Sequence, residues 1–365
     1  MRIVVAMSGG VDSSVAAALL AEQGHDVIGL SMQLYDQSEG QTSFGSCCSI
    51  DDLHDARRVA AKINIPHYIV NLERQFDEQV VSNFVQEYAA GRTPLPCAHC
   101  NSDLKFATLA DRARGFGADV VATGHYARVE RDAATSRYLL RRGLDPVKDQ
   151  SYFLFSLTQD QLARALFPVG DRPKDEVREY ARRRRLPVAD KPDSQEICFI
   201  PDNDYRSFVK KNLTDARLKG SRSIDAAREG VFVDEQGRVL GSHQGIHRFT
   251  IGQRKGLGLA SQSGTPMYVL ALRPADQQVV VGPKSSLERT TLTASGVNWM
   301  LGAPAGPIRV AAQIRHRHQA APATARALGD GHAELVFDAP QIAITPGQAV
   351  VFYDGDVVVG GGWID

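Results

Sequence analysis

Two glycines stand between hydroxyl and carboxylate side chains close to the N-terminus, in the run Ala6-Met7-Ser8-Gly9-Gly10-Val11-Asp12-Ser13. Glycine lets the backbone approach a phosphate closely and adopt conformations that other residues resist. The serines add hydroxyl donors, and the aspartate could cap a helix or orient a metal ion. The run therefore predicts an anion site, although its spacing matches neither the Walker loop nor Gly-x-Gly-x-x-Gly. An ordinary glycine-rich turn is the alternative.

Cysteine is the second residue type in this chain that could do chemistry. Cys97 and Cys100 have Cys-x-x-Cys spacing in a proline-containing loop, just before a segment with helical character, residues 103–113. A helix start favours the thiolate, so the pKa falls and the thiol becomes a nucleophile. Cys198 lies far away in the sequence. Two separated cysteines suggest sulfur handling, in which one carries a persulfide and the other resolves it by forming a disulfide.

The glycine-rich run must be positioned by a strand and a helix. Residues 3–5 are an apolar run typical of a buried strand, and residues 11–19 have apolar positions at helical spacing. Backbone N–H groups and the positive end of a helix then meet at one point. Further strands are expected over residues 26–32, 67–70 and 118–123. In a parallel sheet the strand ends carry the ligand, so Met32, Gly124 and His125 become site candidates.

The second half of the chain differs in its sequence patterns, with arginine-rich segments followed by short strands and turns. Residues 126–142 predict a hairpin with five arginines, and a helix after Pro173 ends in four consecutive arginines, which suit either the helix dipole or a polyanion. Past about residue 205, short β-like pieces alternate with glycine turns. Residues 247–258 form a basic, glycine-bearing element that could contact a phosphate backbone or be a solvated loop. The chain after about residue 266 predicts a small β-barrel or sandwich.

Composition sets the broad class of the protein. The chain has 365 residues, 43% of them hydrophobic, which is enough for two or three domains. Lys+Arg and Asp+Glu both number 42, so a nucleic-acid site would have to be a local basic patch. The five cysteines argue against a secreted disulfide framework, and we expect the adjacent Cys47 and Cys48 to be structural or incidental. No segment reads as a membrane span or a signal peptide, so we expect a cytoplasmic protein.

The Ser-Gly-Gly-x-Asp-Ser run resembles the PP-loop of the N-type ATP pyrophosphatases, which split ATP into AMP and pyrophosphate. Other motifs, in order along nearly the whole chain, resemble those of the bacterial tRNA-specific 2-thiouridylases. These are Gly91-Arg92-Thr93-Pro94, Cys100-Asn101, residues 122–126, residues 148–154, Asp193-Ser194 with Ile197-Cys198-Phe199-Ile200, residues 252–258 and Thr345-Pro346-Gly347-Gln348. The resemblance implies an α/β fold. A doubly wound, Rossmann-like parallel sheet would span residues 1–204, a small central α+β domain that contacts tRNA would span 205–265, and a β-barrel would span 266–365.

The same resemblance implies the ligands and the residues that bind them. ATP, accompanied by Mg²⁺, would contact Ala6, Met7, Ser8, Gly9, Gly10, Val11, Asp12, Ser13, Met32 and Gly124. ATP would adenylate O2 of the wobble uridine of glutamate, glutamine and lysine tRNAs, flipped out of its stack. Cys198 would carry a persulfide received from a cysteine desulfurase or a sulfur-relay protein. Cys100 would attack it, releasing sulfur to C2 and leaving a Cys100–Cys198 disulfide.

The resemblance also implies a tRNA-contacting set. Leu95, Pro96 and Cys97 would border the target base, and His125, Lys148, Asp149, Gln150, Arg315, His316 and Gln348 would face the tRNA. Cys97 departs from the family pattern, because many members have an aspartate there that is assigned acid–base work. A thiol could substitute for it.

Two metal-bound alternatives follow from the cysteines. Cys97, Cys100 and Cys198 could instead hold a [4Fe–4S] cluster, as in related PP-loop tRNA thiolases. Zinc is a weaker fit because it needs a fourth ligand, for which His99 is a candidate. A PP-loop ligase without sulfur chemistry and a non-catalytic RNA-binding protein are the other functional classes. The cysteines argue against the first and the intact loop against the second.

Overall fold

Strand β1 (Arg2–Ala6) is buried on both faces, as expected for the centre of a parallel sheet. The computed structural model describes residues 1–35, 50–193, 197–200, 204–213, 227–259 and 266–365. Ile3 and Val5 face one hydrophobic core, and Val4 and Ala6 face another. This alternation follows from the two-residue period of a strand. The predicted doubly wound arrangement is confirmed, since each core holds helices that cover one face.

The sheet has five parallel strands in the order β3-β2-β1-β4-β7. The other four are β2 (Asp26–Gln33), β3 (His67–Asn71), β4 (Val120–Ala122) and β7 (Ala165–Leu166). One face is covered by α1 (Val11–Glu22), α2 (Ile50–Lys62) and α8 (Lys174–Arg183). The strands expected from the sequence are therefore present, and their carboxyl ends share one edge.

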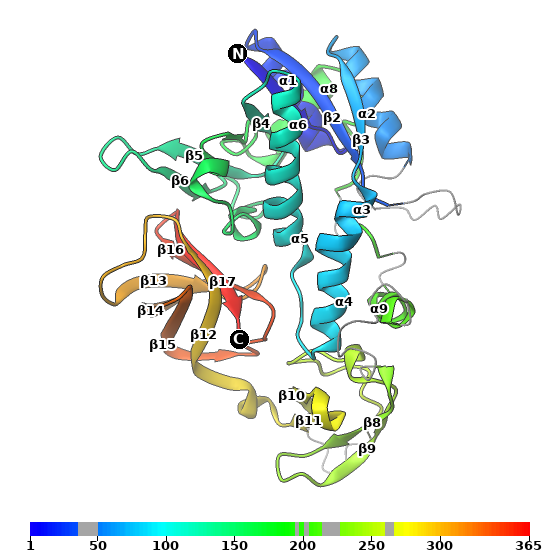
Figure 1. Cartoon of the computed structure of the whole chain (residues 1–365), viewed down its shortest axis with the longest axis vertical. Helices are drawn as coiled ribbons and strands as arrows, with labels where there is room; N and C mark the ends of the chain where they lie inside the picture. The colour runs from blue at the N-terminus through cyan, green and yellow to red at the C-terminus, as the bar shows by residue number, and fades with distance from the viewer. Residues whose placement is uncertain (36–49, 194–196, 201–203, 214–226, 260–265) are drawn as a thin grey trace.

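Two long helical stretches cover the other face and continue beyond the sheet toward the rest of the molecule (Figure 1). The first comprises α3 (Glu73–Phe76), a π-helical segment (Asp77–Val81) and α4 (Ser82–Ala89). The second comprises α5 (Pro96–His99), a π-helical segment (Cys100–Thr108) and α6 (Leu109–Gly115).

The second stretch corrects the prediction for this part of the chain. It begins at Pro96 and not near residue 103, so Cys97 and Cys100 lie inside the helical stretch and not in a loop before it. Proline is well suited to the first helical position because the N–H that it lacks has no intrahelical partner there. Gly91 and Pro94 precede the helix and lie outside it.

The predicted hairpin is present as β5 (Ala127–Arg131) and β6 (Tyr138–Arg142). A short 3₁₀ turn (Ser151–Phe153) and α7 (Gln159–Leu162) follow, and Thr158 and Gln161 form a capping box at the start of α7. The hairpin belongs to the first unit in sequence but pairs with the last strand of the chain, through Val357 and Arg141.

The central unit contains α9 (Tyr205–Leu213) and a four-stranded sheet in the order β10-β11-β8-β9. Its strands are β8 (Gly230–Val233), β9 (Val239–His243), β10 (Tyr268–Arg273) and β11 (Gln278–Gly282). Short 3₁₀ turns occur at Ile246–Arg248, Pro274–Asp276 and Lys284–Leu287. Residues 268–282 thus belong to the central sheet, whereas the sequence-based boundary at 265/266 assigns them to the C-terminal domain. The sequence could not show this pairing, because β11 pairs with β8 across a long connection.

The C-terminal unit is a closed barrel of six strands in the order β12-β15-β14-β13-β16-β17, with β12 pairing to β17. They are β12 (Glu288–Trp299), β13 (Ile308–Gln313), β14 (Ala321–Gly329), β15 (His332–Ile342), β16 (Ala349–Asp354) and β17 (Val357–Ile364). The predicted barrel is confirmed. The described part of the chain has no helix of the length and apolarity that a membrane crossing requires.

Candidate active site

The glycine-rich run links the end of β1 to the start of α1, and its own side chains fold it around the helix N-terminus. Gly10 is the extended residue before the helix, and its carbonyl accepts hydrogen bonds from Ser13 Oγ at 3.2 Å and Ser14 Oγ at 2.7 Å. Ser13 Oγ in turn accepts the Ser8 N–H at 3.2 Å. The loop is therefore held rigid beside the backbone N–H groups that an anion would bind.

Gly9 is the residue in this loop that cannot be replaced without strain. Its φ is +75°, and a Cβ added there would lie 2.2 Å from the carbonyl oxygen of Asp52 in α2. An L-residue resists that conformation, and backbone atoms cannot move aside as a flexible side chain can. Gly9 thus adopts a conformation that other residues resist, and it also allows α2 to pack closely against the loop.

The strand ends meet at this loop. A Cβ on Gly124, just past β4, would lie 2.5 Å from Ser13 N, so the two segments are in direct contact. Met32 lies buried near the carboxyl end of β2, where Ser31 Oγ donates to the Met7 carbonyl at 2.6 Å. The structure therefore brings the predicted ATP-contacting residues together at one edge of the parallel sheet.

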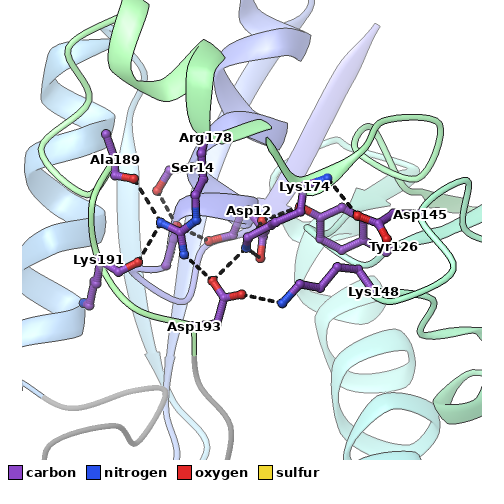
Figure 2. A network of polar contacts seen from close by, with 12 residues as sticks. Asp12, Ser14, Tyr126, Asp145, Lys148, Lys174, Arg178, Ala189, Lys191 and Asp193 are labelled. Atoms are coloured by element: carbon purple, nitrogen blue, oxygen red, sulfur yellow. Dashed lines mark hydrogen bonds and ion pairs between the residues drawn. The ribbon is translucent and has the colours of Figure 1, made fainter. Parts of the chain in front are cut away.

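Asp12 does not cap its own helix. Its carboxylate accepts a hydrogen bond from Tyr126 Oη at 2.7 Å, and Lys174 Nζ donates to both of its oxygens at 2.8 Å (Figure 2). Burial and the neighbouring carboxylate raise the pKa of Tyr126 far above its usual range, so its hydroxyl stays a donor. Asp12 is thus oriented by groups from two other elements.

Asp193 is a second centre of charge beside the loop. Its carboxylate accepts hydrogen bonds or ion pairs from Lys148 at 2.7 Å, Lys174 at 2.9 Å and Arg178 at 2.6 Å. Burial alone would raise the pKa of Asp193, but the hydrogen bonds from Lys148 and Lys174 lower it to about 2. This aspartate is therefore an anion at every physiological pH.

Lys191, two residues before Asp193, contacts the glycine-rich loop directly. Its Nζ donates to the Gly9 carbonyl at 3.1 Å and to the carboxylates of Asp52 and Asp55 at 2.5 and 2.6 Å. Residues 191 and 193 immediately precede the stretch that carries Cys198. The chain that delivers this cysteine is consequently anchored on the glycine-rich loop.

The three site cysteines differ in exposure. Cys97 is exposed, Cys100 is buried, and Cys198 is half-buried. Cys100 belongs to the core cluster against which Cys198 packs. The neighbouring Phe199 lies edge-on to Phe76 and Phe84, with ring centroids 5.4 and 5.2 Å away. Cys100 and Cys198, distant in sequence, are thus both in contact with the hydrophobic core that the two long helical stretches help to form. Cys47 and Cys48 lie outside the described residues.

Comparison with known proteins places this site in a family. Three family models match successive parts of the chain: a tRNA methyl transferase HUP domain over residues 1–202, a tRNA methyl transferase PRC-barrel domain over 222–283, and an aminomethyltransferase beta-barrel domain over 289–364. The tRNA-specific 2-thiouridylase MnmA of Geotalea uraniireducens is 52% identical over 369 residues, which cover 100% of this chain and 95% of that protein. The chain belongs to the tRNA-specific 2-thiouridylase family.

Other members of the family are similar over the same length. The 2-thiouridylase of Solibacter usitatus is 53% identical over 374 residues, covering 100% of this chain and 99% of that one, and the enzyme of Clostridioides difficile is 47% identical over 365 residues, covering 100% and 98%. Among solved structures, a 4-thiouridine synthetase–RNA complex with bound ATP overlays with a TM-score of 0.33 and 16% identity, covering 57% of this chain and 50% of that one. That overlay is too weak to support an argument.

The residues expected at the target base in this 2-thiouridylase lie where the second helical stretch begins. Leu95 and Pro96 are buried, and Cys97 beside them is exposed. His125 is held by the Thr123 hydroxyl at 2.7 Å and lies near the rings of Phe106 and Phe167. Burial, with a smaller contribution from Lys105, lowers the pKa of His125 to about 3, so its imidazole is neutral.

The side chains at residues 148–150, which are expected to contact tRNA, are paired with other groups of the protein. Lys148 pairs with Asp193, and the Gln150 side chain accepts the Tyr126 N–H at 3.0 Å. The Asp149 carboxylate accepts from Arg142 at 2.8 Å and from Ser151 Oγ at 3.0 Å. A direct tRNA contact at Asp149 would therefore require Asp149 to give up its contacts with Arg142 and Ser151.

Two of the barrel residues expected to contact tRNA, Arg315 and Gln348, line a cavity of about 490 Å³ between the three units. It is lined by Thr93 of the catalytic unit, by Thr250, Ile251, Gly252, Tyr268, Lys284 and Leu287, and by Arg315, Ile342, Ala343, Thr345 and Gln348 of the barrel. Gln348 Nε2 donates to the Thr93 carbonyl at 3.0 Å, which fixes the loop leading to Cys97. His316 is exposed, with its ring 4.6 Å from that of Phe153.

The cysteines do not fit a metal cluster as they are arranged here. Among the described residues, which include Cys97, Cys100 and Cys198, no three or more His, Cys, Asp or Glu side chains gather so that they could hold a metal ion. A cluster requires convergent thiolates. His99, the candidate fourth zinc ligand, instead stacks on Trp363 at 4.4 Å and contacts Asp103 at 3.2 Å. No step is therefore derived through a bound metal cluster.

Sequence reasoning missed several members of the site. Tyr126 and Asp193 were within quoted motifs but had no role, and Lys174 and Arg178 were unmarked. The only signal for Lys174 is its position directly after Pro173, at the start of a helix packed against α1.

Proposed function

We propose that this protein is an ATP-dependent tRNA-uridine 2-sulfurtransferase that makes 2-thiouridine at the wobble position. The observation that carries the proposal is a rigid Ser-Gly-Gly loop at a helix N-terminus, anchored to the segment that carries Cys198. Full-length similarity of about one residue in two to proteins named tRNA-specific 2-thiouridylase supports the choice of substrate.

The first half of the proposed reaction activates the base. The triphosphate of ATP binds at the N-terminus of α1, where backbone N–H groups and the helix dipole favour an anion. O2 of the flipped uracil attacks the α-phosphorus, and pyrophosphate leaves with the electrons of the bond that breaks. Asp12 is the loop carboxylate that would hold the Mg²⁺ that accompanies ATP, in place of its contacts with Lys174, since this ion commonly uses one or two carboxylates together with phosphate oxygens.

The second half transfers sulfur. Cys198 carries a persulfide received from a cysteine desulfurase or a relay protein. The Cys100 thiolate attacks the Cys198 sulfur, a Cys100–Cys198 disulfide forms, and the released sulfide adds to C2 and expels AMP. The persulfide sulfur gains the two electrons that the cysteines lose, so an external thiol must reduce the disulfide before the next turnover. Cys100 is buried and Cys198 is half-buried against the same hydrophobic core, which limits the access of water to the sulfur.

The tRNA is proposed to lie across all three units. Cys97 and the buried residues beside it would border the target base, and Arg315 and His316 would contact the tRNA from the barrel. Wobble uridines of glutamate, glutamine and lysine tRNAs are the expected targets, and the cytoplasm is the expected location. Because chemistry on a base requires its extrusion from the stack, the substrate must be a loop nucleotide.

The test uses the full chain with a tRNA transcript, ATP, Mg²⁺, a cysteine desulfurase and cysteine. Formation of 2-thiouridine is measured by mass spectrometry of the digested tRNA, and pyrophosphate is measured in the same sample. We expect the Cys198→Ser variant to make pyrophosphate but no 2-thiouridine, and the Cys47→Ser variant to match the wild type. A wild-type protein that consumes ATP without modifying the tRNA would overturn the proposal.

A further inference from the structure

Lys174 is a lysine enclosed by protein beside the glycine-rich loop. Its side chain is 8% exposed, whereas its partners Asp12 and Asp193 are 30% and 23% exposed. It is the first residue of α8, and because Pro173 has no hydroxyl or carboxylate to cap that helix, Asp145 accepts the Lys174 backbone N–H at 3.0 Å. An enclosed lysine must be paired, and these contacts fix its position as well as its charge.

The ammonium group uses all three of its donors on carboxylates. It reaches both oxygens of Asp12 at 2.8 Å and one oxygen of Asp193 at 2.9 Å (Figure 2). Asp12 lies in the first turn of α1, so the ammonium lies at the mouth of the site where an anion would bind. The positive charge of Lys174 is therefore already beside the loop before any ligand binds.

Neither carboxylate depends on Lys174 alone. Asp12 also accepts from Tyr126 Oη, and Asp193 also accepts from Lys148 and Arg178. If the ammonium turned toward an incoming anion, both carboxylates would keep a donor. A buried charge without a partner is costly, so this redundancy removes the main barrier to such a movement.

We propose that Lys174 stabilises the pyrophosphate leaving group during adenylation. This inference rests on the proposed function and adds a residue to that reaction. As uracil O2 bonds to the α-phosphorus, the bond from that phosphorus to the bridging oxygen breaks, and its electron pair stays on the bridging oxygen of pyrophosphate. The ammonium of Lys174 turns from Asp12 to this oxygen and offsets the new negative charge. A cation already held beside the loop is effective because bulk water does not have to reorganise to offset the new charge.

The test varies the leaving group. The β,γ-difluoromethylene, fluoromethylene and methylene analogues of ATP release bisphosphonates of increasing basicity, and the basicity of the pyrophosphate released from ATP lies between those of the first and the last. Single-turnover rates of their release are measured with tRNA for the wild type and for the Lys174→Met and Lys174→Arg variants. We expect Lys174→Met to lower the rate with ATP about 100-fold, the order seen when a transition-state donor is removed. The loss should grow as the leaving group becomes more basic, and Lys174→Arg should restore part of both the rate and the dependence.

Lys191→Met is the matched control, because Lys191 also ties charged side chains to the loop but pairs with Gly9, Asp52 and Asp55. A purely structural role predicts a loss that is the same for every analogue, and we expect that pattern for Lys191→Met. The same pattern for both Lys174 variants, folded and binding tRNA, would overturn the inference. If Lys174→Met does not fold, the dependence measured for Lys174→Arg decides. A wild type that releases no pyrophosphate would overturn the proposed function itself.

Discussion

Asp356, in the turn between β16 and β17 of the barrel, accepts a hydrogen bond at 2.6 Å from Arg141 of the catalytic unit's hairpin. Arg128 of the same hairpin donates to the other carboxylate oxygen, also at 2.6 Å. The hairpin and the barrel therefore share a sheet and a pair of ionic contacts. Since Arg142 beside them holds Asp149, this junction also supports the loop at residues 148–150.

Replacing Asp356 with alanine should loosen the junction. Its side chain is 41% exposed, so solvent screens both pairs, and we expect a loss of about 0.5–1 kcal/mol in the free energy of unfolding. Burial alone would raise the pKa of Asp356. The hydrogen bond from Arg141 outweighs burial, so the pKa of Asp356 is lowered. The contribution is therefore present above its ordinary pKa and lost as the pH falls below it. Urea denaturation at pH 7 measures the change.

The Asp338→Ala variant is the control for this experiment, because Asp338 pairs with Arg309 inside the barrel and at a more exposed site. We expect Asp338→Ala to lower the free energy of unfolding less than Asp356→Ala does. Limited proteolysis should cleave between the units faster in Asp356→Ala and at the wild-type rate in Asp338→Ala. If the two variants lost the same free energy of unfolding and were cleaved equally by a protease, the Asp356 contacts would not join the hairpin to the barrel.

Gly124→Ala should weaken ATP binding without affecting tRNA. A Cβ at this position would lie 2.5 Å from Ser13 N and 2.6 Å from the carbonyl carbon of Asp12, so the strand end and the loop must separate. Overpacking of this kind costs about 1–3 kcal/mol, which corresponds to about a 5- to 150-fold rise in the KM for ATP. Steady-state kinetics at saturating tRNA measures it. Gly115→Ala is the control, since nothing lies within 4 Å of its added Cβ.

The catalytic loop could be predicted from the sequence because its geometry depends on adjacent residues. A buried strand, two glycines and an amphipathic helix specify their turn locally, and Gly9, Ser13 and Gly124 lie where they were expected. The barrel was also predictable as a class, from short strands and turns. The sequence could not show what long-range contacts decide: the membership of β10 and β11 in the central sheet, and the contacts of Asp149 with Arg142 and Ser151.

Lys174 shows why the rest could not be predicted. A lysine at the start of a charged helix has no sequence feature that distinguishes it from a solvated one. Its partners are 162 residues before it and 19 residues after it, and only the packing of α8 against α1 brings them together. The same holds for Tyr126, whose hydroxyl reaches Asp12 across 114 residues.

Stability should fall in acid partly through Asp193. Its pKa is lowered to about 2, so its contribution is complete above the unfolded-state pKa near 4 and is lost as the pH falls toward 2. Allowing for solvent screening, we expect a loss of about 1 kcal/mol over this range. Asp193→Asn should flatten that part of the profile, measured by urea denaturation between pH 2 and pH 6. Asp190→Asn is the control, because Asp190 is 79% exposed, and an identical flattening in it would contradict the assignment.

Iron should not be required for activity. Cys97, Cys100 and Cys198 are not gathered as metal ligands, so protein purified without oxygen should make 2-thiouridine at a rate unrelated to its iron and acid-labile sulfide content. Cys100→Ser and Cys198→Ser should each abolish 2-thiouridine, because one thiol carries the sulfur and the other releases it. Cys97→Ser should keep activity within about 10-fold, since an exposed residue beside the base affects positioning more than sulfur transfer. Activity that follows iron content and disappears in Cys97→Ser would mean that the three cysteines converge on a cluster during the reaction, and the persulfide route would have to be replaced.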